Sequence, residues 1–315
     1  MQGPAVHQAP PLHDGSGDGP WIWLIAGTGE GPRLAFRLLE RGWRVRVSVV
    51  SAAAGRAYPP HPRLSLTVGA LGGEAGAPAA AVQADLAAAT GRGQPFRWVI
   101  DATHPFACRI SAALTQACER QGQPLLRLQR PHTEAQGARI LPDLSSLTQE
   151  QLADRRLLLA LGARRLGEAI RYGPTAVHHA RLLPSPGALR QAMAAGIPAQ
   201  RVACLRPPAE PEAAATVEAA LCRRWRIEAV LCRRSGGPSE AHWRRICQEM
   251  GLRLLLLERP PEEPGVTALG LEALVAWVGD PPAEHPGSAN LTETQPPPSA
   301  CDGRDPTGAG AHQRS

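Results

Sequence analysis

Apolar positions in this chain fall into short runs that alternate with longer segments of helical spacing. The run at 21–26 is continuously apolar, and 44–50 alternates apolar and polar positions; both patterns are typical of strands. Strands that alternate with helices favour parallel sheets, so the pattern predicts an α/β fold. We expect strands at 21–26, 44–50, 64–68, 97–100, 125–128, 156–161, 175–179, 201–205, 227–232 and 253–257. Helices are expected at 32–41, up to 89, at 103–121, after 162, and at 186–195, 210–225, 239–250 and 267–278.

The same order of elements occurs in each half of the chain. The segment 24–27 matches 159–162, and each half closes on an Arg-Pro pair, at 130–131 and 259–260. This repeat predicts two Rossmann-like, doubly wound parallel-sheet domains, with the functional site in a cleft between them. The expected divisions are a disordered leader at 1–20, domains at 21–131 and 156–279, a connection at 132–155 and a disordered tail at 280–315.

A glycine-rich loop of Gly27, Thr28, Gly29 and Glu30 follows the first expected strand. Backbone N–H groups at such a helix start can bind the phosphates of a cofactor; the alternative is a plain tight turn. The loop is not the complete dinucleotide fingerprint, because Pro32 stands at the third glycine position. No acidic residue ends the second strand, where Ser48 lies as a candidate cofactor contact. An acid there would bind a ribose 2′-hydroxyl and repel a 2′-phosphate, so the pattern favours NADP over NAD.

Polar residues follow the expected strand at 97–100, where Asp101, Thr103 and His104 stand before an expected helix. Ligands of open α/β sheets bind beyond the carboxyl ends of the strands, so these three are candidate functional residues. Asp101 and His104 are the catalytic candidates, since a histidine of ordinary pKa can deliver a proton near neutral pH. Thr103 is a candidate cofactor contact. The alternative is that Asp101 or Thr103 caps the helix and that His104 is a surface residue.

The equivalent position in the second half carries Arg233, Arg234, Ser235, Gly236 and Gly237. A serine and two glycines before a helix leave backbone N–H groups free to bind an anion, and two arginines add positive charge. We therefore assign Ser235, Gly236 and Gly237 to the cofactor and the two arginines to the substrate. The alternative is a flexible loop whose arginines are solvated.

Composition narrows the range of functions. All 34 basic residues are arginine, so the chain has no lysine for Schiff-base or P-loop chemistry. The net charge of +6 favours anionic partners. Seven cysteines without a C-x-x-C pair predict reduced thiols and a cytoplasmic location. The sequence shows no metal-ligand spacing, no apolar stretch of membrane-spanning length and no secretory signal at 1–20, so we expect none of these.

Three segments together resemble the precorrin-6A reductase family of cobalamin biosynthesis. They are 27–30, the string Asp-Ala-Thr-His-Pro-Phe-Ala at 101–107, and Ser-Gly-Gly at 235–237 followed by a helix and Glu-Arg-Pro at 258–260. The segment 161–164, which ends in Arg164, is similar to the family's opening of the second domain. The chain departs from the family pattern at Arg233 and Arg234, where a lysine and a small polar or acidic residue are usual.

The resemblance covers 21–279 and implies a two-domain reductase. Such enzymes use NADPH, with NADH as the other candidate, to reduce one double bond of precorrin-6A or its cobalt form to the corresponding precorrin-6B. The substrate is then a polycarboxylate tetrapyrrole, whose carboxylates would bind arginines, Arg164 included. We expect a cytoplasmic monomer that binds neither nucleic acid nor membrane. Two alternatives remain open: a two-domain nucleotide-sugar glycosyltransferase, and an arginine-rich nucleic-acid-binding protein.

Overall fold

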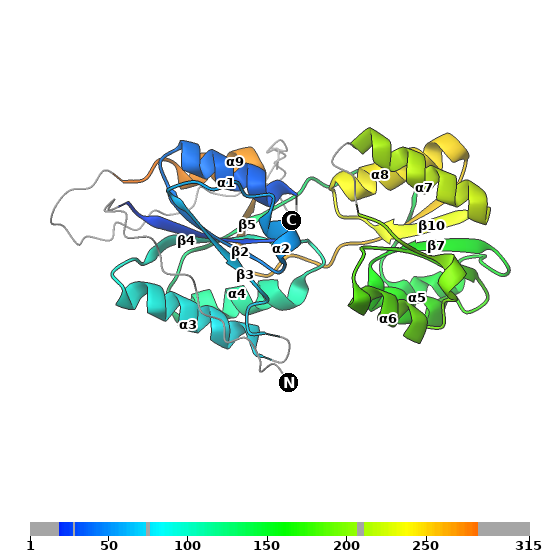
Figure 1. Cartoon of the computed structure of the whole chain (residues 1–315), viewed down its shortest axis with the longest axis horizontal. Helices are drawn as coiled ribbons and strands as arrows, with labels where there is room; N and C mark the ends of the chain where they lie inside the picture. Colours follow the sequence, from blue (N-terminus) through cyan, green and yellow to red (C-terminus); the bar gives the residue numbers. More distant parts are fainter. Residues whose placement is uncertain (1–18, 28, 74–75, 207–210, 283–315) are drawn as a thin grey trace, which may run out of the picture. The chain divides into compact units, whose positions relative to one another are not determined.

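The computed structural model of the chain describes residues 19–27, 29–73, 76–206 and 211–282 (Figure 1). All of these residues belong to one compact unit, which ends at Pro282. The two ends that we expected to be disordered, 1–20 and 280–315, lie outside the described residues except for 19–20 and 280–282. No helix among the described residues is long and apolar enough to cross a membrane.

The first sheet has six parallel strands in the order β12-β5-β4-β1-β2-β3. The strands are β1 (Trp21–Ala26), β2 (Arg44–Val49), β3 (Leu64–Val68), β4 (Phe96–Ala102), β5 (Leu125–Leu128) and β12 (Thr267–Leu269). Helices α1 (Glu30–Glu40) and α9 (Leu271–Val278) cover one face, and α3 (Pro78–Gly91) and α4 (Cys108–Arg120) cover the other (Figure 1). A short helix, α2 (Ala52–Gly55), follows β2. Because helices cover both faces, every residue of the central strand β1 is buried.

The second sheet also has six parallel strands, in the order β6-β11-β10-β7-β8-β9. They are β6 (Arg139–Leu141), β7 (Arg156–Ala160), β8 (Val177–Leu182), β9 (Val202–Cys204), β10 (Ala229–Arg233) and β11 (Arg253–Leu257). Helices α5 (Leu166–Tyr172) and α6 (Pro186–Ala194) pack on one face, and α7 (Pro211–Trp225) and α8 (Pro238–Met250) on the other (Figure 1). The described part of the chain also contains short 3-10 helices at Leu144–Gln149, Ala163–Arg165 and Ala199–Arg201.

Both sheets follow one plan. Beginning at β3, the first sheet runs third, second, first, fourth and fifth strand, which is the Rossmann order, and β12 adds a sixth strand. Beginning at β9, the second sheet runs in the same order, and β6 adds its sixth strand. The α/β class, the two Rossmann-like sheets and the repeated order of elements are therefore confirmed.

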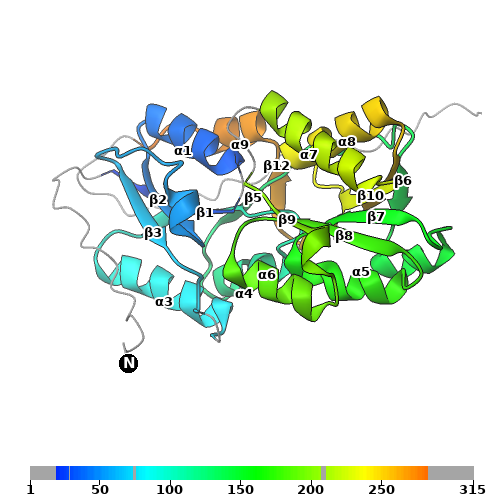
Figure 2. The same ribbon diagram turned by 45° about the vertical axis from the view of Figure 1, so that its right-hand side comes forward.

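The two sheets do not follow the expected boundaries at 131 and 156. The segment expected to be a plain connection, 132–155, contains β6, which pairs with β11 of the second sheet. The expected helix at 267–278 is a strand and a shorter helix: β12 pairs with β5 of the first sheet, and α9 packs with α1 (Figure 2). β6 and β12 have three residues each, too few for a periodic pattern to identify them, whereas β9, equally short, lies within the expected strand 201–205.

The helix after β4 also begins later than expected. Pro105 is not at a first helical position, because the chain makes a turn in which the Ala107 N–H donates to the His104 carbonyl oxygen at 2.7 Å. The helix α4 begins only at Cys108. This turn keeps Thr103 and His104 in a loop at the carboxyl end of β4.

Candidate functional site

The glycine loop after β1 lies beside the loop after β4. The Gly27 N–H donates to the Ala102 carbonyl oxygen at 3.4 Å. A side chain at Gly27 would place its Cβ 3.6 Å from the Thr103 Cα and from the His104 nitrogen, so the two loops approach closely at the carboxyl edge of the first sheet. Gly29 is the exposed N-cap of α1, and Thr28 lies outside the described residues.

Gly31 is a glycine whose role the spacing analysis missed. A Cβ there would overlap the Tyr58 hydroxyl and lie 2.8 Å from the Ala26 Cβ, so only glycine lets α1 pack this closely on β1. The glycine of the dinucleotide fingerprint that serves helix–strand packing is thus present one position before Pro32. Burial raises the pKa of Tyr58, which keeps its phenol neutral. No sequence pattern pointed to Tyr58.

A cavity of about 260 Å³ lies over the carboxyl ends of β1 and β2. Gly27, Val49, Ala54 and Tyr58 contribute to its lining. At the start of α2, the Ser51 hydroxyl accepts a hydrogen bond from the Ala54 N–H at 3.2 Å. The cavity has the position at which a Rossmann-like sheet binds the nucleoside half of a dinucleotide.

Ser48 does not lie with the other candidates. It is 4 % exposed, and its hydroxyl accepts a hydrogen bond from the Trp23 Nε1–H at 2.8 Å. Its side chain therefore lies in the core of the first sheet, where it satisfies a buried indole, and a ligand at the strand ends cannot reach it in this structure.

Asp101 holds the β4 loop in place. One carboxylate oxygen accepts a hydrogen bond from the Thr103 N–H at 2.9 Å, and the other forms an ion pair with Arg127. Arg127 on β5 also donates to the Ser111 hydroxyl at 2.8 Å and pairs with Glu262. Asp101 is almost fully buried, so it acts on the site through Thr103 and is not an exposed acid.

His104 is held with a defined ring orientation. Its Nδ1 accepts a hydrogen bond from the Phe106 N–H at 3.2 Å, so the proton of the neutral ring is on Nε2. Burial and, to a smaller extent, the positive charges of Arg233 and Arg130 together lower the pKa of His104 to about 4. The ring is therefore neutral at pH 7, and its pKa differs from the ordinary histidine value that the sequence suggested.

Arg233 and Arg234 have different surroundings although they are neighbours. The Arg233 guanidinium lies 5.1 Å from the centre of the Phe106 ring, and its buried Nε makes no hydrogen bond within the described part of the chain. Burial lowers its pKa, as do the charges of Arg165 and the exposed Arg164. This contact brings the ends of β4 and β10 together, and it leaves Arg233 available to an anion.

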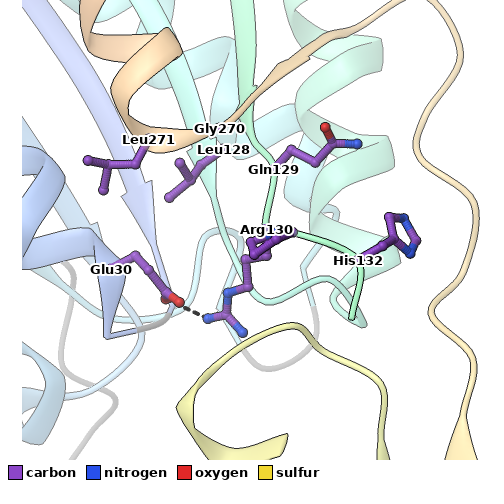
Figure 3. Close-up of a pocket in the computed structure, with 8 residues that line it drawn as sticks. Glu30, Leu128, Gln129, Arg130, His132, Gly270 and Leu271 are labelled. Carbon is purple, nitrogen blue, oxygen red and sulfur yellow. Dashed lines mark hydrogen bonds and ion pairs between the residues drawn. The ribbon is translucent and has the colours of Figure 1, made fainter. Parts of the chain in front are cut away.

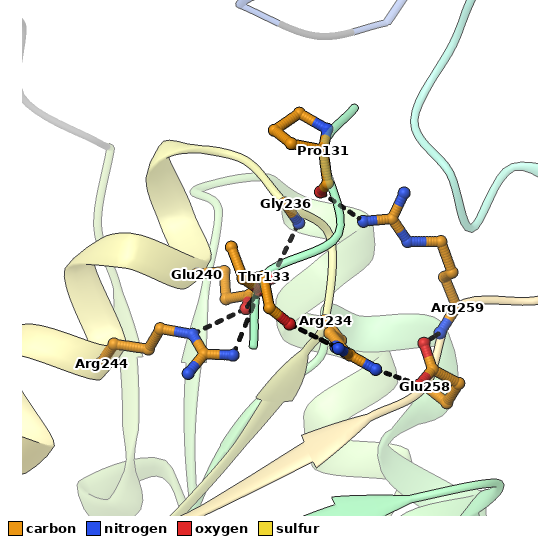
Figure 4. Close-up of polar contacts among 8 residues, drawn as sticks. All are labelled: Pro131, Thr133, Arg234, Gly236, Glu240, Arg244, Glu258 and Arg259. Atoms are coloured by element: carbon orange, nitrogen blue, oxygen red, sulfur yellow. Dashed lines mark hydrogen bonds and ion pairs between the residues drawn. The ribbon is translucent and has the colours of Figure 1, made fainter. Parts of the chain in front are cut away.

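Arg234 is occupied by its own protein (Figure 4). Its Nη1 pairs with the Glu258 carboxylate at 2.6 Å, and its Nε donates to the Thr133 carbonyl oxygen at 3.2 Å. The side chain joins the two segments that cross between the sheets. The expectation that it binds substrate does not agree with these contacts.

The Ser-Gly-Gly segment is not a set of bare N–H groups. The Ser235 N–H donates to the Arg233 carbonyl oxygen at 2.9 Å, and the Gly236 N–H donates to the Glu240 carboxylate at 2.7 Å (Figure 4). Gly236 has φ +67°, and a Cβ there would overlap the Pro131 carbonyl oxygen. A Cβ at Gly237 would lie 2.6 Å from an Arg130 nitrogen. The glycines are needed because the chain at 130–131 passes directly over them.

Arg130 lies beside the start of α1. Its Nη2 pairs with the Glu30 carboxylate at 2.6 Å, at the side of a cavity of about 280 Å³ that His132 and Leu271 also line (Figure 3). The sequence marked Arg130 only as the end of a repeat.

Among the described residues, no group of three or more His, Cys, Asp or Glu side chains is arranged to bind a metal ion.

Two parallel sheets in Rossmann order, with glycine loops at the ends of their strands, define an α/β protein with two Rossmann-like sheets. Over residues 21–279 the chain matches the family described as "Precorrin-6x reductase CbiJ/CobK", and it belongs to this family. The family assignment does not favour the glycosyltransferase or nucleic-acid-binding alternatives.

Named relatives agree with this assignment. The chain is 35 % identical over 252 residues to the cobalt-precorrin-6A reductase of Synechocystis sp., covering 78 % of this chain and 90 % of the relative. It is 28 % identical over 273 residues to the precorrin-6A reductase of Rhodococcus erythropolis, covering 82 % and 97 %. The solved structure of CobK precorrin-6A reductase superposes with a TM-score of 0.62 at 27 % identity, covering 82 % of this chain and 96 % of that one.

Proposed function

We propose that this protein uses NADPH to reduce one double bond of precorrin-6A, or of its cobalt form, to the corresponding precorrin-6B. The observation that carries the proposal is membership of the precorrin-6x reductase family over 21–279. The geometry supports it, because Gly27 lies beside Thr103 and His104 at the carboxyl edge of a Rossmann-ordered sheet.

The residues present fit a nicotinamide dinucleotide. The exposed Gly27 and Gly29 leave room at the start of α1 for a diphosphate, and the cavity next to Val49 and Tyr58 suits the adenosine half. Thr103 and His104 would then lie near the nicotinamide. The bound cofactor supplies the hydride; the protein must orient it and exclude water.

The chain's own residues would bind and position the substrate. Arg233, with a buried Nε that lacks a hydrogen bond, and the exposed Arg164 suit the carboxylates at the rim of a tetrapyrrole. His104 presents its Nε2–H as a hydrogen-bond donor. A carboxylate that neutralises Arg233 removes one of the charges that lower the His104 pKa, and so favours the protonated ring, which is the form that can deliver a proton.

The preference for NADPH over NADH rests on the end of β2. No acidic residue stands there, and the exposed Arg56 follows the short helix α2. We expect Arg56→Glu to weaken NADPH binding by about tenfold and to change NADH binding little, because only NADPH carries the 2′-phosphate. Calorimetric titration of both cofactors checks this, and equal losses for the two would contradict it.

The function itself is tested by anaerobic incubation of the protein with NADPH and either precorrin-6A or its cobalt form. We expect nicotinamide absorbance to fall with one substrate form and a product two hydrogens heavier to appear. Absence of turnover with both forms would refute the proposal.

We also propose a cytoplasmic monomer; the cysteines of the described residues, all free thiols, support a reducing compartment.

A further inference from the structure

Arg130 lies where three parts of the candidate site meet. Its guanidinium pairs with Glu30 in the first turn of α1, lies against Gly237 at the start of α8, and is close enough to His104 to lower the pKa of that ring. We propose that Arg130 is a positioning residue that neutralises Glu30, so that the anionic diphosphate of the cofactor can bind at the start of α1. This inference rests on the proposed use of a nicotinamide dinucleotide.

Glu30 presents the problem that Arg130 solves. The helix dipole favours a carboxylate in the first turn of α1, and the same field favours the diphosphate of a cofactor. Two anions at one helix start repel each other. The Glu30 side chain is 24 % exposed, so water screens its charge only in part. The Arg130 Nη2, 2.6 Å from the Glu30 carboxylate, cancels that charge (Figure 3).

The second half of the chain fixes the position of Arg130. Arg259 donates from Nη1 to the Arg130 carbonyl oxygen at 3.0 Å and from Nη2 to the Pro131 carbonyl oxygen at 2.9 Å. Gly236 and Gly237 provide the space through which the Arg130 backbone and side chain pass. The proposed reaction does not explain the two Arg-Pro pairs or the Ser-Gly-Gly segment. In this proposal, both serve to hold Arg130 in position.

The proposal makes the effect of Arg130 depend on Glu30. Without Arg130, an unpaired carboxylate faces the incoming diphosphate. When Glu30 is neutral as well, as in the double variant, no carboxylate repels the diphosphate. A merely structural role of Arg130 predicts instead that its loss has the same effect whether residue 30 is charged or neutral.

The experiment measures the Kd of NADPH for the full chain and for Arg130→Gln, Glu30→Gln and the double variant. We expect Arg130→Gln to raise the Kd at least tenfold, with a penalty that shrinks at high salt. Glu30→Gln should lower the Kd about threefold, and the double variant should bind at least fivefold more tightly than Arg130→Gln. Arg130→Lys, which keeps the charge, should lie nearer the parent protein than Arg130→Gln does.

Arg46→Gln is the matched control. Arg46 pairs with Asp85 at 2.7 Å, and its side chain is 9 % exposed, as that of Arg130 is, but it lies against α3 and away from the glycine loop. We expect this variant to lose stability without a change in NADPH affinity beyond twofold. An Arg130→Gln variant that binds like the parent, or a double variant no better than Arg130→Gln, would overturn the inference alone. A parent protein that binds no NADPH would instead refute the proposed function.

Discussion

The arginines at the carboxyl edges of the sheets divide by the partner that each one has. Arg127, Arg130 and Arg234 each pair with a carboxylate of the protein and hold a segment of backbone in place. Arg233 lies over an aromatic ring, and its buried Nε has no hydrogen-bond partner among the described residues. Since this half-buried guanidinium has no carboxylate partner in the described part of the chain, Arg233 is the one of these four that an incoming anion can pair with.

His104 should make the stability of the protein sensitive to mild acid. Its folded-state pKa of about 4 lies below the ordinary value of 6.5, so the unfolded chain binds a proton more readily. Stability is therefore unaffected by this group above pH 6.5 and falls as pH decreases towards 4. Urea denaturation at pH 7 and pH 5 should show a smaller loss for His104→Gln than for the parent. An equal loss in both proteins would show that other groups dominate.

His104→Ala should lower turnover more than it weakens substrate binding. If the ring delivers the proton, we expect a fall in kcat of about 100-fold with a much smaller change in KM. Steady-state kinetics at saturating NADPH give both values. Full turnover in this variant would mean that the proton comes from water and that His104 only closes the turn before α4.

Single residues also show where sequence analysis fails. Ser48 follows Val45 and Val47 in a strand of alternating polarity, a pattern that places polar side chains toward solvent or ligand. In this sheet, α3 and α4 cover the face that carries the polar side chains of β2, so Ser48 and Arg46 are buried. Ser48 accepts a hydrogen bond from Trp23, and Arg46 pairs with Asp85. Alternation alone does not tell a half-exposed strand from one covered on both sides.

At the scale of elements, the end of β10 and the loop after it carry two neighbouring arginines with different roles, Arg233 and Arg234. We expect Arg233→Ala to raise the KM for the tetrapyrrole, with a penalty that shrinks at high salt, and to leave the melting temperature nearly unchanged. Arg234→Ala removes the ion pair with Glu258 and the contact with Thr133, so it should lower the melting temperature by several degrees. Kinetics and thermal unfolding of both variants test this division, and identical behaviour would argue against it.

Elements with a strong pattern were predicted well, but of the three-residue strands β6, β9 and β12 only β9 was expected. Strands such as β1 and β10 and the long helices stand near their expected ranges, because burial of a whole strand or helix face needs many apolar residues. β6 and β12 were missed because three residues that complete a sheet edge need only backbone pairing. The tips of the strands could be located from sequence, but the partners of Asp101, Arg234 and Gly236 depend on segments distant in the chain.

At the scale of the whole molecule, the first sheet is completed by β12, a strand that follows the whole of the second sheet in sequence. A chain trimmed to 19–282 keeps the Trp43 to Gly279 hydrogen bond and the Arg41–Asp280 pair, so it should melt like the full chain and keep its turnover. A chain that ends at Val266 lacks β12 and α9 and should fail to fold cooperatively. Thermal unfolding compares the three, and a large loss in the 19–282 chain would contradict the expectation that its ends are dispensable.

The return of the chain to its first sheet also governs how the protein forms during synthesis. The ribosome completes β5 well over 100 residues before β12, which is to pair with it, so the edge of β5 and the apolar side of α1 that α9 later covers wait unpartnered while the second sheet is made. Translation through 132–266 is therefore the period of greatest exposure to aggregation. The edge of β5 and this side of α1 become covered only when β12 and α9 have left the exit tunnel.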